Sequence, residues 1–552
     1  MSAPAKEFRR VLPFLRPYQW RIVGVFLLGI LASSLGLVQP WLSKMLIDRG
    51  LLARDLSMLA WCAGGMAIAA VLAMALNAMS SLAYVSLSAA MLFDMRRALF
   101  EHLQRLSPRF FARQRLGDIV SRLNGDIGEV QRAAADVPMA ILTNAVFLAG
   151  SVALMLSLNP KLFVAGVSVV PIAVWFARQM QTRLGDQSRE LRERSASVGS
   201  FLIESLQALR LVVAVARERH ESGRFAGENA RYVESLMQLQ RTSMWLGAVP
   251  GTLMTLATAG VFLYGGRLIF DGELTLGGLV AFMAYHSRML SPVQNLLSLA
   301  STVSVAKASL HRVFELFDTV PDVVESQAPR LPASNAGHVR FHDVSVSQNG
   351  VPVLAAASFE VAPGTLCVIA GPSGAGKSTL GDLLVRFLDP DSGTIEVDGV
   401  DLREWPLARL REHVALADQS PVLFHGTVRE NLRYASPGAT EADLEDVAKD
   451  LDITGLLHRA STGERGTALS AGERQRIAIA QTLLRPARVF VFDEPTAALD
   501  PKNETRLVAT IRKRLAGRTV IVITHREALI AQADQAITIG GGIAVASART
   551  MA

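Results

Sequence analysis

A glycine-rich stretch in the second half of the chain has the residue types and spacing of a phosphate-binding loop. Residues 371–378 fit the pattern G-x-x-x-x-G-K-S and follow an apolar stretch, 366–370, that is typical of a β-strand. In such a loop the backbone N–H groups surround the β-phosphate, while the lysine, here Lys377, reaches the β- and γ-phosphates. The expected nucleotide-binding residues are Gly371, Pro372, Ser373, Gly374, Ala375, Gly376, Lys377, Ser378 and Thr379.

Two adjacent carboxylates end another apolar stretch, 489–492, further along the chain. We expect Asp493 to bind Mg²⁺ together with the hydroxyl of Ser378, and Glu494 to polarise the water that attacks the γ-phosphate. One carboxylate for the metal and one for the water is the division of roles that hydrolysis requires. The order of these elements predicts ATP hydrolysis, with ATP and Mg²⁺ as the bound ligands.

Between these two elements the chain reads Leu-Ser-Ala-Gly-Glu at residues 469–473. With this segment, the chain resembles the ABC transporter family in its exporter-type half-transporter form, over nearly its whole length. The resemblance implies that the segment contacts the γ-phosphate of ATP held by a second subunit, so that a dimer is needed to complete a site. The residues implied to contact nucleotide across the dimer are Ser470, Ala471, Gly472, Glu473 and Asp500.

Further positions match the family's motifs one at a time. Gln419 matches the glutamine that contacts Mg²⁺ and senses the transmembrane domain, and His525 matches the histidine at the γ-phosphate. Residues 463–466, Gly-Glu-Arg-Gly, resemble the loop that meets the partner's coupling segment. The resemblance thus implies Glu494, His525 and Gln419 as catalytic residues, and Ser378, Gln419 and Asp493 as Mg²⁺ ligands.

Three features depart from the family pattern. Gln348, which we also place among the nucleotide-binding residues, stands where the family usually has an adenine-stacking tyrosine. Loss of that stack weakens binding by roughly 1–3 kcal/mol unless another group covers the base. Ala471 replaces a usual glycine and Glu473 stands where glutamine is common, changes small enough for activity to survive. The stretch 431–463 is short, which predicts a trimmed helical subdomain.

The first half of the chain is apolar and predicts a membrane domain. Hydrophobic residues make up 50% of the 552 residues. Six stretches approach the ~20 residues that cross ~30 Å of hydrocarbon. The predicted spans are about 21–43, 57–85, 139–158, 162–182, 244–267 and 275–298.

The arginines indicate the orientation in the membrane. They are concentrated in two long connections, 93–137 and 178–242, whereas the opposite connections are short and hold few basic residues. By the positive-inside rule, the long connections, both termini and the ATPase domain are cytoplasmic, which favours a bacterial inner membrane. The net charge of +7 is then mainly a topology signal, and we expect membrane lipids but no nucleic acid among the partners.

A long proline-free stretch predicts that one helix projects far out of the membrane. A helix from about Leu56 to Arg105 would be roughly 75 Å long, more than twice the hydrocarbon thickness. At the turn that follows, residues 110–122 resemble the family's first coupling segment. The coupling residues implied by that resemblance are Gly117, Asp118 and Arg122. A second, less distinctive turn at 204–217 is a further coupling candidate.

The chain is therefore predicted to be a multidomain membrane protein. Its fold class is a six-helix α transmembrane domain with long cytoplasmic helix extensions, followed by an α/β P-loop ABC ATPase domain. The predicted domains are an interfacial N-terminal helix (1–20), the transmembrane domain (21–320), a proline-containing linker (321–336) and the ATP-binding domain (337–552). Cys62 and Cys367 fall in different domains, so no disulfide is expected between them.

Intramembrane polar residues are the leads on the cargo: Asn77, Asn144, His286, Arg288, Gln294 and Asn295. On the sixth span, His286 and Arg288 could form a positive patch that favours an anionic or amphipathic cargo. Hydrogen bonding between helices, or a position near the cytoplasmic interface, is an equally good interpretation of the same two residues.

The sequence thus predicts half of an ATP-driven transporter that exports a small molecule, lipid or peptide by alternating access. A homodimer is favoured, and a heterodimer remains open because of the altered 469–473 segment and Gln348. An exporter-shaped importer of a metal chelate is a second alternative. A non-transporting ABC ATPase, from a different class, is disfavoured by the six apolar spans.

Overall fold

The computed structural model describes residues 9–348, 350–372, 374–459, 461–463, 466–497, 501–540 and 543–547. The chain forms two compact units. The first comprises Met1–Leu103 and Leu116–Asp318, and the second comprises Gln104–Arg115 and Thr319–Ala552. The short stretch 104–115 therefore belongs to the second unit, although in the chain it lies between two helices of the first.

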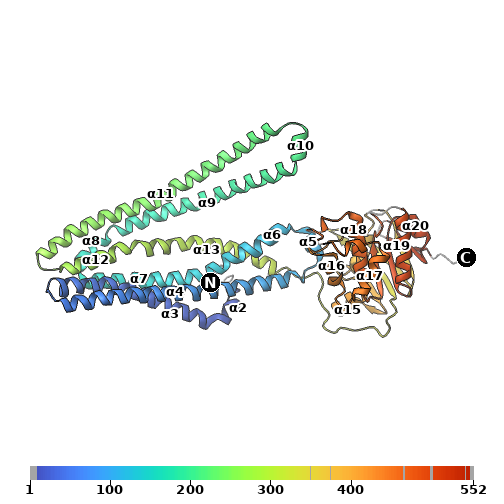
Figure 1. Ribbon diagram of the computed structural model, residues 1–552, viewed down its shortest axis with the longest axis horizontal. Helices are drawn as coiled ribbons and strands as arrows, with labels where there is room; N and C mark the ends of the chain where they lie inside the picture. Colours follow the sequence, from blue (N-terminus) through green and yellow to red (C-terminus); the bar gives the residue numbers. More distant parts are fainter. Residues whose placement is uncertain are drawn as a thin grey trace. The chain divides into compact units, whose positions relative to one another are not determined.

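The first unit is all helical, and Figure 1 shows its long helices running side by side. The pairs in closest association are α3 with α4, α9 with α11, and α7 with α13. Its elements are α2 (Leu12–Leu15), η1 (Arg16–Tyr18), α3 (Gln19–Met45), η2 (Leu46–Leu51), α4 (Leu56–Leu103), α6 (Leu116–Ser121), η3 (Arg122–Asp126), α7 (Ile127–Leu158), α8 (Pro160–Val167), α9 (Val170–Gln207), α10 (Leu209–Ala214), α11 (Glu218–Phe270), α12 (Leu276–Arg288) and α13 (Leu290–Phe317).

Five stretches of helix in the described residues are long and apolar enough to cross a membrane. They contain the first five predicted spans: Leu12–Leu51, Leu56–Leu103, Leu116–Leu158, Pro160–Gln207 and Glu218–Phe270. The long projecting helix is confirmed as α4, which has 48 residues. The chain is accordingly a multi-pass membrane protein.

The predicted sixth span, 275–298, is two helices and not one. α12 ends at Arg288 and α13 begins at Leu290. Pro292 has no N–H to donate to the carbonyl of Arg288, so the helical hydrogen-bond ladder is interrupted at this point. The sequence-based expectation of a single sixth helix is corrected in this respect.

Each half of this broken crossing is bound to a different neighbour. In α12, the Tyr285 hydroxyl donates to the Leu37 carbonyl of α3 at 2.5 Å, and the Gly277 N–H donates to Asp48 at 2.9 Å. In α13, Arg312 Nε and the Ser309 hydroxyl donate to the Asp126 carboxylate at 2.8 and 2.9 Å. The break therefore lies between two anchored segments.

The second unit is built on two sheets, as predicted for a P-loop ATPase. A four-stranded antiparallel sheet has the order β2-β1-β4-β5, and a six-stranded sheet has the order β10-β9-β3-β8-β7-β6, with only β10 antiparallel. The strands are β1 (Val339–Gln348), β2 (Val351–Val361), β3 (Leu366–Ala370), β4 (Ser392–Val397), β5 (Val400–Asp401), β6 (Val414–Ala417), β7 (Val489–Asp493), β8 (Thr519–Ile523), β9 (Gln535–Gly540) and β10 (Ile543–Ser547).

Helices cover the six-stranded sheet so that its central strands are buried on both faces. In β3, Cys367 and Ile369 pack into one hydrophobic core, while Leu366 and Val368 pack into a second core on the other face. The helices of this unit are α5 (Pro108–Arg113), α14 (Lys377–Leu384), α15 (Leu407–His413), α16 (Val428–Ala435), α17 (Glu441–Asp450), η4 (Thr454–Leu456), α18 (Ala471–Leu483), α19 (Pro501–Arg514) and α20 (Glu527–Ala531).

Candidate functional site

The predicted nucleotide residues meet at one edge of the six-stranded sheet. The phosphate loop follows β3, Gln419 follows β6, Asp493 ends β7 and His525 follows β8. These four strands are parallel, so their carboxyl ends lie at the same edge, where open α/β sheets bind ligands. The fold thus brings together residues that are up to about 150 positions apart in the sequence.

The phosphate loop has a backbone that only glycine allows at its key positions. Gly376 has φ +88°, and a Cβ there would lie 2.8 Å from the Val353 carbonyl oxygen. A Cβ on Gly371 would lie 2.3 Å from the Ile539 carbonyl oxygen. Helix α14 begins directly after Gly376, so its first N–H groups face the loop. Ser373 lies outside the described residues.

Lys377 is buried beside this loop. Its ammonium donates to the carbonyls of Gly371 and Pro372, both at 2.8 Å. These carbonyls hold the lysine charge at the position where the loop would receive phosphates. Entry of a phosphate group replaces two neutral acceptors with a charged one, which makes a stronger hydrogen bond.

Asp493 is 6% exposed, and burial raises the pKa of its carboxyl, whereas the hydroxyl of Ser378 lowers it by hydrogen bonding. Its Oδ1 has no hydrogen-bond partner among the described residues. An unpartnered carboxylate oxygen next to a hydroxyl matches the hard-oxygen ligands that Mg²⁺ prefers. Asp493 and Ser378 therefore fit the predicted metal role, while the amide nitrogen of Gln419 bonds elsewhere.

Glu494 is the point on which the other predicted catalytic residues converge. Gln419 Nε2 donates to its Oε2 at 2.8 Å, and His525 Nδ1 lies 3.3 Å from its Oε1. The carboxylate is thus held on both oxygens by groups from two other strand ends. All three residues predicted to act in hydrolysis lie together in the structure.

The backbone of Glu494 is strained, and its neighbours hold it in place. Its φ is +45°, which is rare for a residue with a Cβ. Its N–H donates to the Ile523 carbonyl at 2.9 Å, and its carbonyl accepts from Gln475 Nε2 at 2.6 Å. Sequence reasoning missed Gln475, although its position two residues after the 469–473 segment could have drawn attention to it.

The 469–473 segment begins a helix, and Glu473 helps to hold that helix end. The Ser470 hydroxyl accepts from the Glu473 N–H at 3.2 Å, and the Glu473 carboxylate accepts from the Ser470 N–H at 2.7 Å. This reciprocal cap lowers the pKa of Glu473 and explains why glutamate is tolerated where glutamine is common. Ala471 and Gly472 form the first turn of α18. Asp500, like Glu464 and Arg465, lies outside the described residues.

Gln348 lies at the exposed end of β1, opposite Val351 in the hairpin with β2. The two phenyl rings of that hairpin, those of Phe341 and Phe359, are buried and stack on each other at 4.4 Å, so neither is exposed to cover a base. The hairpin also carries the exposed imidazole of His342, six positions before Gln348. The hairpin therefore offers Gln348 where the family pattern has an aromatic ring.

The predicted coupling residues lie in the first unit. Gly117 and Asp118 are exposed on α6, and Arg122 begins η3. Arg122 Nη1 donates to Glu315 at 2.9 Å and to the Arg312 carbonyl at 3.2 Å, so it joins η3 to α13. Its structural role is to connect two helices at the same end of this unit.

Sequence reasoning also missed an electrostatic interaction between α5 and α14 within the second unit. Burial raises the pKa of the Asp382 carboxyl on α14 to about 6, and Arg109 of α5 opposes this rise. The nearby carboxylates of Asp418 and Asp493 raise it further. The charge of Arg109 thus acts on an acidic group of the same unit as the nucleotide residues, a relation that no local sequence motif signals.

The two residues predicted for the substrate pathway have different surroundings. His286 is fully buried, with Nδ1 3.3 Å from the Thr258 hydroxyl and Nε2 3.1 Å from the Gly166 carbonyl, so it joins α12 to α11 and α8. Arg288 is exposed and donates to Gln39 at 3.4 Å. The structure does not bring them together as one positive patch.

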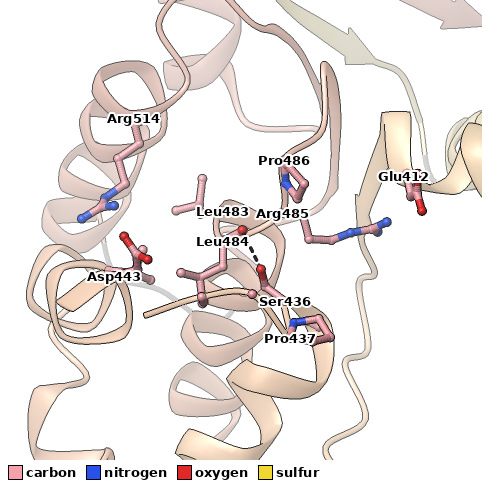
Figure 2. Close-up of a pocket in the computed structure, with 13 residues that line it drawn as sticks. Glu412, Ser436, Pro437, Asp443, Leu483, Leu484, Arg485, Pro486 and Arg514 are labelled. Carbon is pink, nitrogen blue, oxygen red and sulfur yellow. Dashed lines mark hydrogen bonds between the residues drawn. The ribbon is translucent and has the colours of Figure 1, made fainter. Parts of the chain in front are cut away.

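A separate hollow lies on the second unit, and some of its lining residues are labelled in Figure 2. Its volume is about 600 Å³. It lies between the α16–α17 connection and the end of α18, where the Ser436 hydroxyl donates to the Leu484 carbonyl at 3.0 Å. Arg485 and Arg514 also line it, but none of the predicted nucleotide residues does. This hollow is therefore distinct from the nucleotide site.

Comparisons with known proteins agree with this architecture. The family model described as ABC transporter transmembrane region matches residues 22–293, and the model described as ABC transporter matches residues 354–497. A bacterial Atm1-family ABC exporter with ATP bound has a similar structure, with a TM-score of 0.79 and 26% identity over 95% of this chain and 94% of that one.

Curated relatives extend over almost the entire length. An ATP-dependent lipid A-core flippase of Thiobacillus denitrificans is 30% identical over 98% of this chain and 95% of its own. An uncharacterized ABC transporter ATP-binding protein of Bacillus subtilis is 29% identical, over 97% and 90%. A putative multidrug export ATP-binding/permease protein of the same species is 29% identical, over 97% and 94%.

Proposed function

We propose that this chain, which belongs to the ABC transporter family as an exporter half-transporter, uses ATP hydrolysis to move an amphipathic small molecule or lipid across a membrane. The observation that carries the proposal is the convergence of Gln419 and His525 on Glu494, beside a phosphate loop. The relatives named as a lipid flippase and as a multidrug exporter support an amphipathic cargo.

The residues of the site have distinct tasks in hydrolysis. Lys377 leaves the carbonyls of Gly371 and Pro372 to bind phosphate oxygens. Glu494, oriented by Gln419 and His525, polarises the attacking water. Ser378 and Asp493 would hold Mg²⁺, which neutralises phosphate charge when bound.

The dimer follows from the role proposed for the 469–473 segment. Ser470 and Gly472 lie at the N-terminus of α18, where N–H groups favour an anion, and the proposal places the γ-phosphate of the other subunit's ATP there. A homodimer supplies two complete sites and is favoured, with a heterodimer as the alternative. Closure of the ATPase dimer on ATP and reopening after hydrolysis would then drive alternating access.

The test is ATP-dependent movement of a fluorescent lipid across proteoliposomes that contain the purified chain. Movement by the parent and not by Glu494→Gln supports the proposal. Glu527→Gln is the matched control, because Glu527 is an exposed acid on α20 and outside the site. ATP hydrolysis without movement of any amphiphile would instead indicate a non-transporting ATPase.

A further inference from the structure

A polar hollow of about 410 Å³ lies inside the membrane unit, among α3, α4, α7 and α13. Its lining includes hydroxyl and amide side chains from three of these helices: Ser33, Asn77, Ser80, Tyr84, Thr143 and Asn144. We call it the amide–hydroxyl pocket. No Asp, Glu, Lys, Arg or His is among its described lining residues.

The pocket lies at membrane depth. Ser33 is about 18 Å of helix from Met45, and Asn144 is about 21 Å from the end of α7 at Leu158, both within ~30 Å of hydrocarbon. Polar side chains at this depth are costly unless they have partners, and they usually face a cavity or another polar group. The polar lining therefore needs an explanation.

Several of these groups lack partners among the described residues. Thr143 and the amide nitrogen of Asn144 bond to carbonyls of their own helix, at 2.9 and 2.7 Å. Asn77, Ser80 and Tyr84 make no hydrogen bond to any described residue, and Ser80 is only 6% exposed. Free donors and acceptors thus surround one hollow, which is the arrangement of a binding site.

The break in the sixth crossing lies beside this pocket. Pro292, at the start of α13, is one of its lining residues, and it leaves the Arg288 carbonyl without its helical donor. Irregular backbone at membrane depth is tolerated where it lines a cavity. The broken helix is an observation independent of the polar side chains, and it also indicates a cavity at this position.

The chemistry of the lining selects the head group of a ligand. Amides and hydroxyls both donate and accept hydrogen bonds, as sugar hydroxyls do, whereas phosphates and carboxylates only accept. A charged head would lie here without a counter-ion from the lining, at considerable cost. The rings of Tyr84 and Phe147 add flat apolar surfaces that suit the C–H faces of a sugar.

The surroundings suit an apolar chain on the same ligand. Met79 and Leu82, next to the pocket residues on α4, are 57% and 73% exposed. Acyl chains could lie against them while the head group occupies the hollow. A volume of about 410 Å³ is in the range of small-molecule sites.

We infer that the amide–hydroxyl pocket binds the uncharged polyhydroxyl head group of an amphiphile, so that the cargo is a neutral glycolipid-like molecule and not an anion. This inference rests on the proposed function, since it names the cargo class of the proposed exporter. It differs from the sequence-based expectation of a positive patch, because neither His286 nor Arg288 lines this pocket.

The experiment uses the full chain in phosphatidylcholine nanodiscs, with ATPase activity as the readout. Monoglucosyl diacylglycerol is titrated against phosphatidylglycerol with the same acyl chains. The glucosyl lipid should stimulate turnover at lower concentration than phosphatidylglycerol. In Asn77→Leu and Asn144→Leu, its half-maximal concentration should rise about fivefold for each amide lost.

The matched control is Asn229→Leu, because Asn229 is an exposed asparagine of α11 outside the pocket. It should leave the half-maximal concentration unchanged. A photoactivatable glucosyl lipid provides a second measurement on the parent chain, which does not depend on the variants folding. Cross-links should map to residues 29–33, 77–84 or 139–147, or to Pro292.

Greater potency of phosphatidylglycerol, an equal shift in Asn229→Leu, or cross-links outside these positions would overturn the inference. So would loss of the dimer in the pocket variants, which would assign the lining to a subunit contact. If the chain hydrolyses ATP and moves other amphiphiles, only this inference fails. If no amphiphile is moved at all, the proposed function fails.

Discussion

The site around Glu494 and the amide–hydroxyl pocket differ in whether their polar side chains have hydrogen-bond partners. At Glu494, both carboxylate oxygens have partners, and two backbone hydrogen bonds fix a strained φ. In the amide–hydroxyl pocket, Asn77 and Ser80 have no partner among the described residues. A site that performs a reaction needs fixed geometry, whereas a site that must release its ligand needs groups whose partners can change.

The elements that carry the two sites also differ in rigidity. The nucleotide residues lie at the ends of parallel strands that are buried on both faces, so their positions are rigid. The pocket lies beside an interrupted helix between anchored segments. We expect substitutions at the first site to change rates strongly, and substitutions at the second to change the apparent affinity for cargo.

The largest effect is expected for Glu494→Gln. Removing the charge that polarises water should lower ATP turnover by about 10²- to 10³-fold, while ATP affinity changes little because Lys377 and the loop remain. Steady-state turnover and nucleotide binding by the purified chain check this. Turnover close to the parental rate would remove the basis for treating this site as the rigid, chemical one.

The next effect is expected for Gln348→Tyr. A ring at the exposed end of β1 should stack on adenine and tighten ATP binding by about 1–3 kcal/mol. Titration of ATP and GTP into parent and variant tests it, with Gln348→Leu to separate stacking from simple loss of the amide. Unchanged affinity would show that another residue already covers the base.

A smaller effect on stability is expected for Asp382→Asn. Burial raises the pKa of this carboxyl from 3.8 to about 6, so the folded state disfavours its charge. The free-energy cost of ionising Asp382 in the folded state is absent below the pKa of 3.8 that applies to the unfolded chain, and it is complete above about pH 6. Asparagine should therefore stabilise the chain at pH 7.5 by on the order of 1–2 kcal/mol, after allowance for partial solvent exposure, and by less at pH 5.

Calorimetric melting at the two pH values measures this difference. Glu445→Gln, at an exposed position of α17, is the control and should show no pH-dependent gain. Arg109→Ala should enlarge the gain, because Arg109 is the charge that opposes the raised pKa. A gain that is larger at pH 5 than at pH 7.5 would contradict the assigned cause.

The smallest effect is expected for Arg288→Ala. Its guanidinium is exposed and bonds to Gln39 at a long 3.4 Å. With an uncharged cargo, lipid-stimulated turnover should change by less than about twofold, the size of a weak exposed contact. A tenfold loss of stimulation by an anionic lipid would instead support the sequence-based hypothesis that Arg288 binds an anionic cargo. It would also contradict the distinction between the two sites.

The positions of the residues proposed for ATP hydrolysis could be predicted because their motifs are local and their backbone is dictated by residue type. Gly376 must be glycine at φ +88°, and the carboxylates of 493–494 end a strand that is uniformly apolar. Gln475 and Asp382 were missed because their roles come from partners in distant elements.

The membrane unit was predicted in outline and not in detail. Hydropathy locates helices, and it located five of them well. It does not tell which face of a helix meets which neighbour, so the pairing of His286 with Thr258 and Gly166 could not be foreseen. The helix break before Pro292 could have been predicted, because the sequence shows that a proline, which lacks an N–H, stands at this position.

The anchoring of α12 and α13 to different neighbours also has a mechanical consequence. Tyr285 fastens one half to α3, and Asp126 fastens the other to η3, so we expect bending between these anchors at 288–292, where the helical hydrogen bonds are interrupted. With its 28 residues, α13 is a lever about 42 Å long, and a tilt of about 5° at the joint displaces its far end by about 4 Å, together with η3, which is bonded to it. That end is Phe317, two residues before the ATPase unit begins, so a small change beside the pocket becomes a stroke large enough to shift the chain that enters that unit.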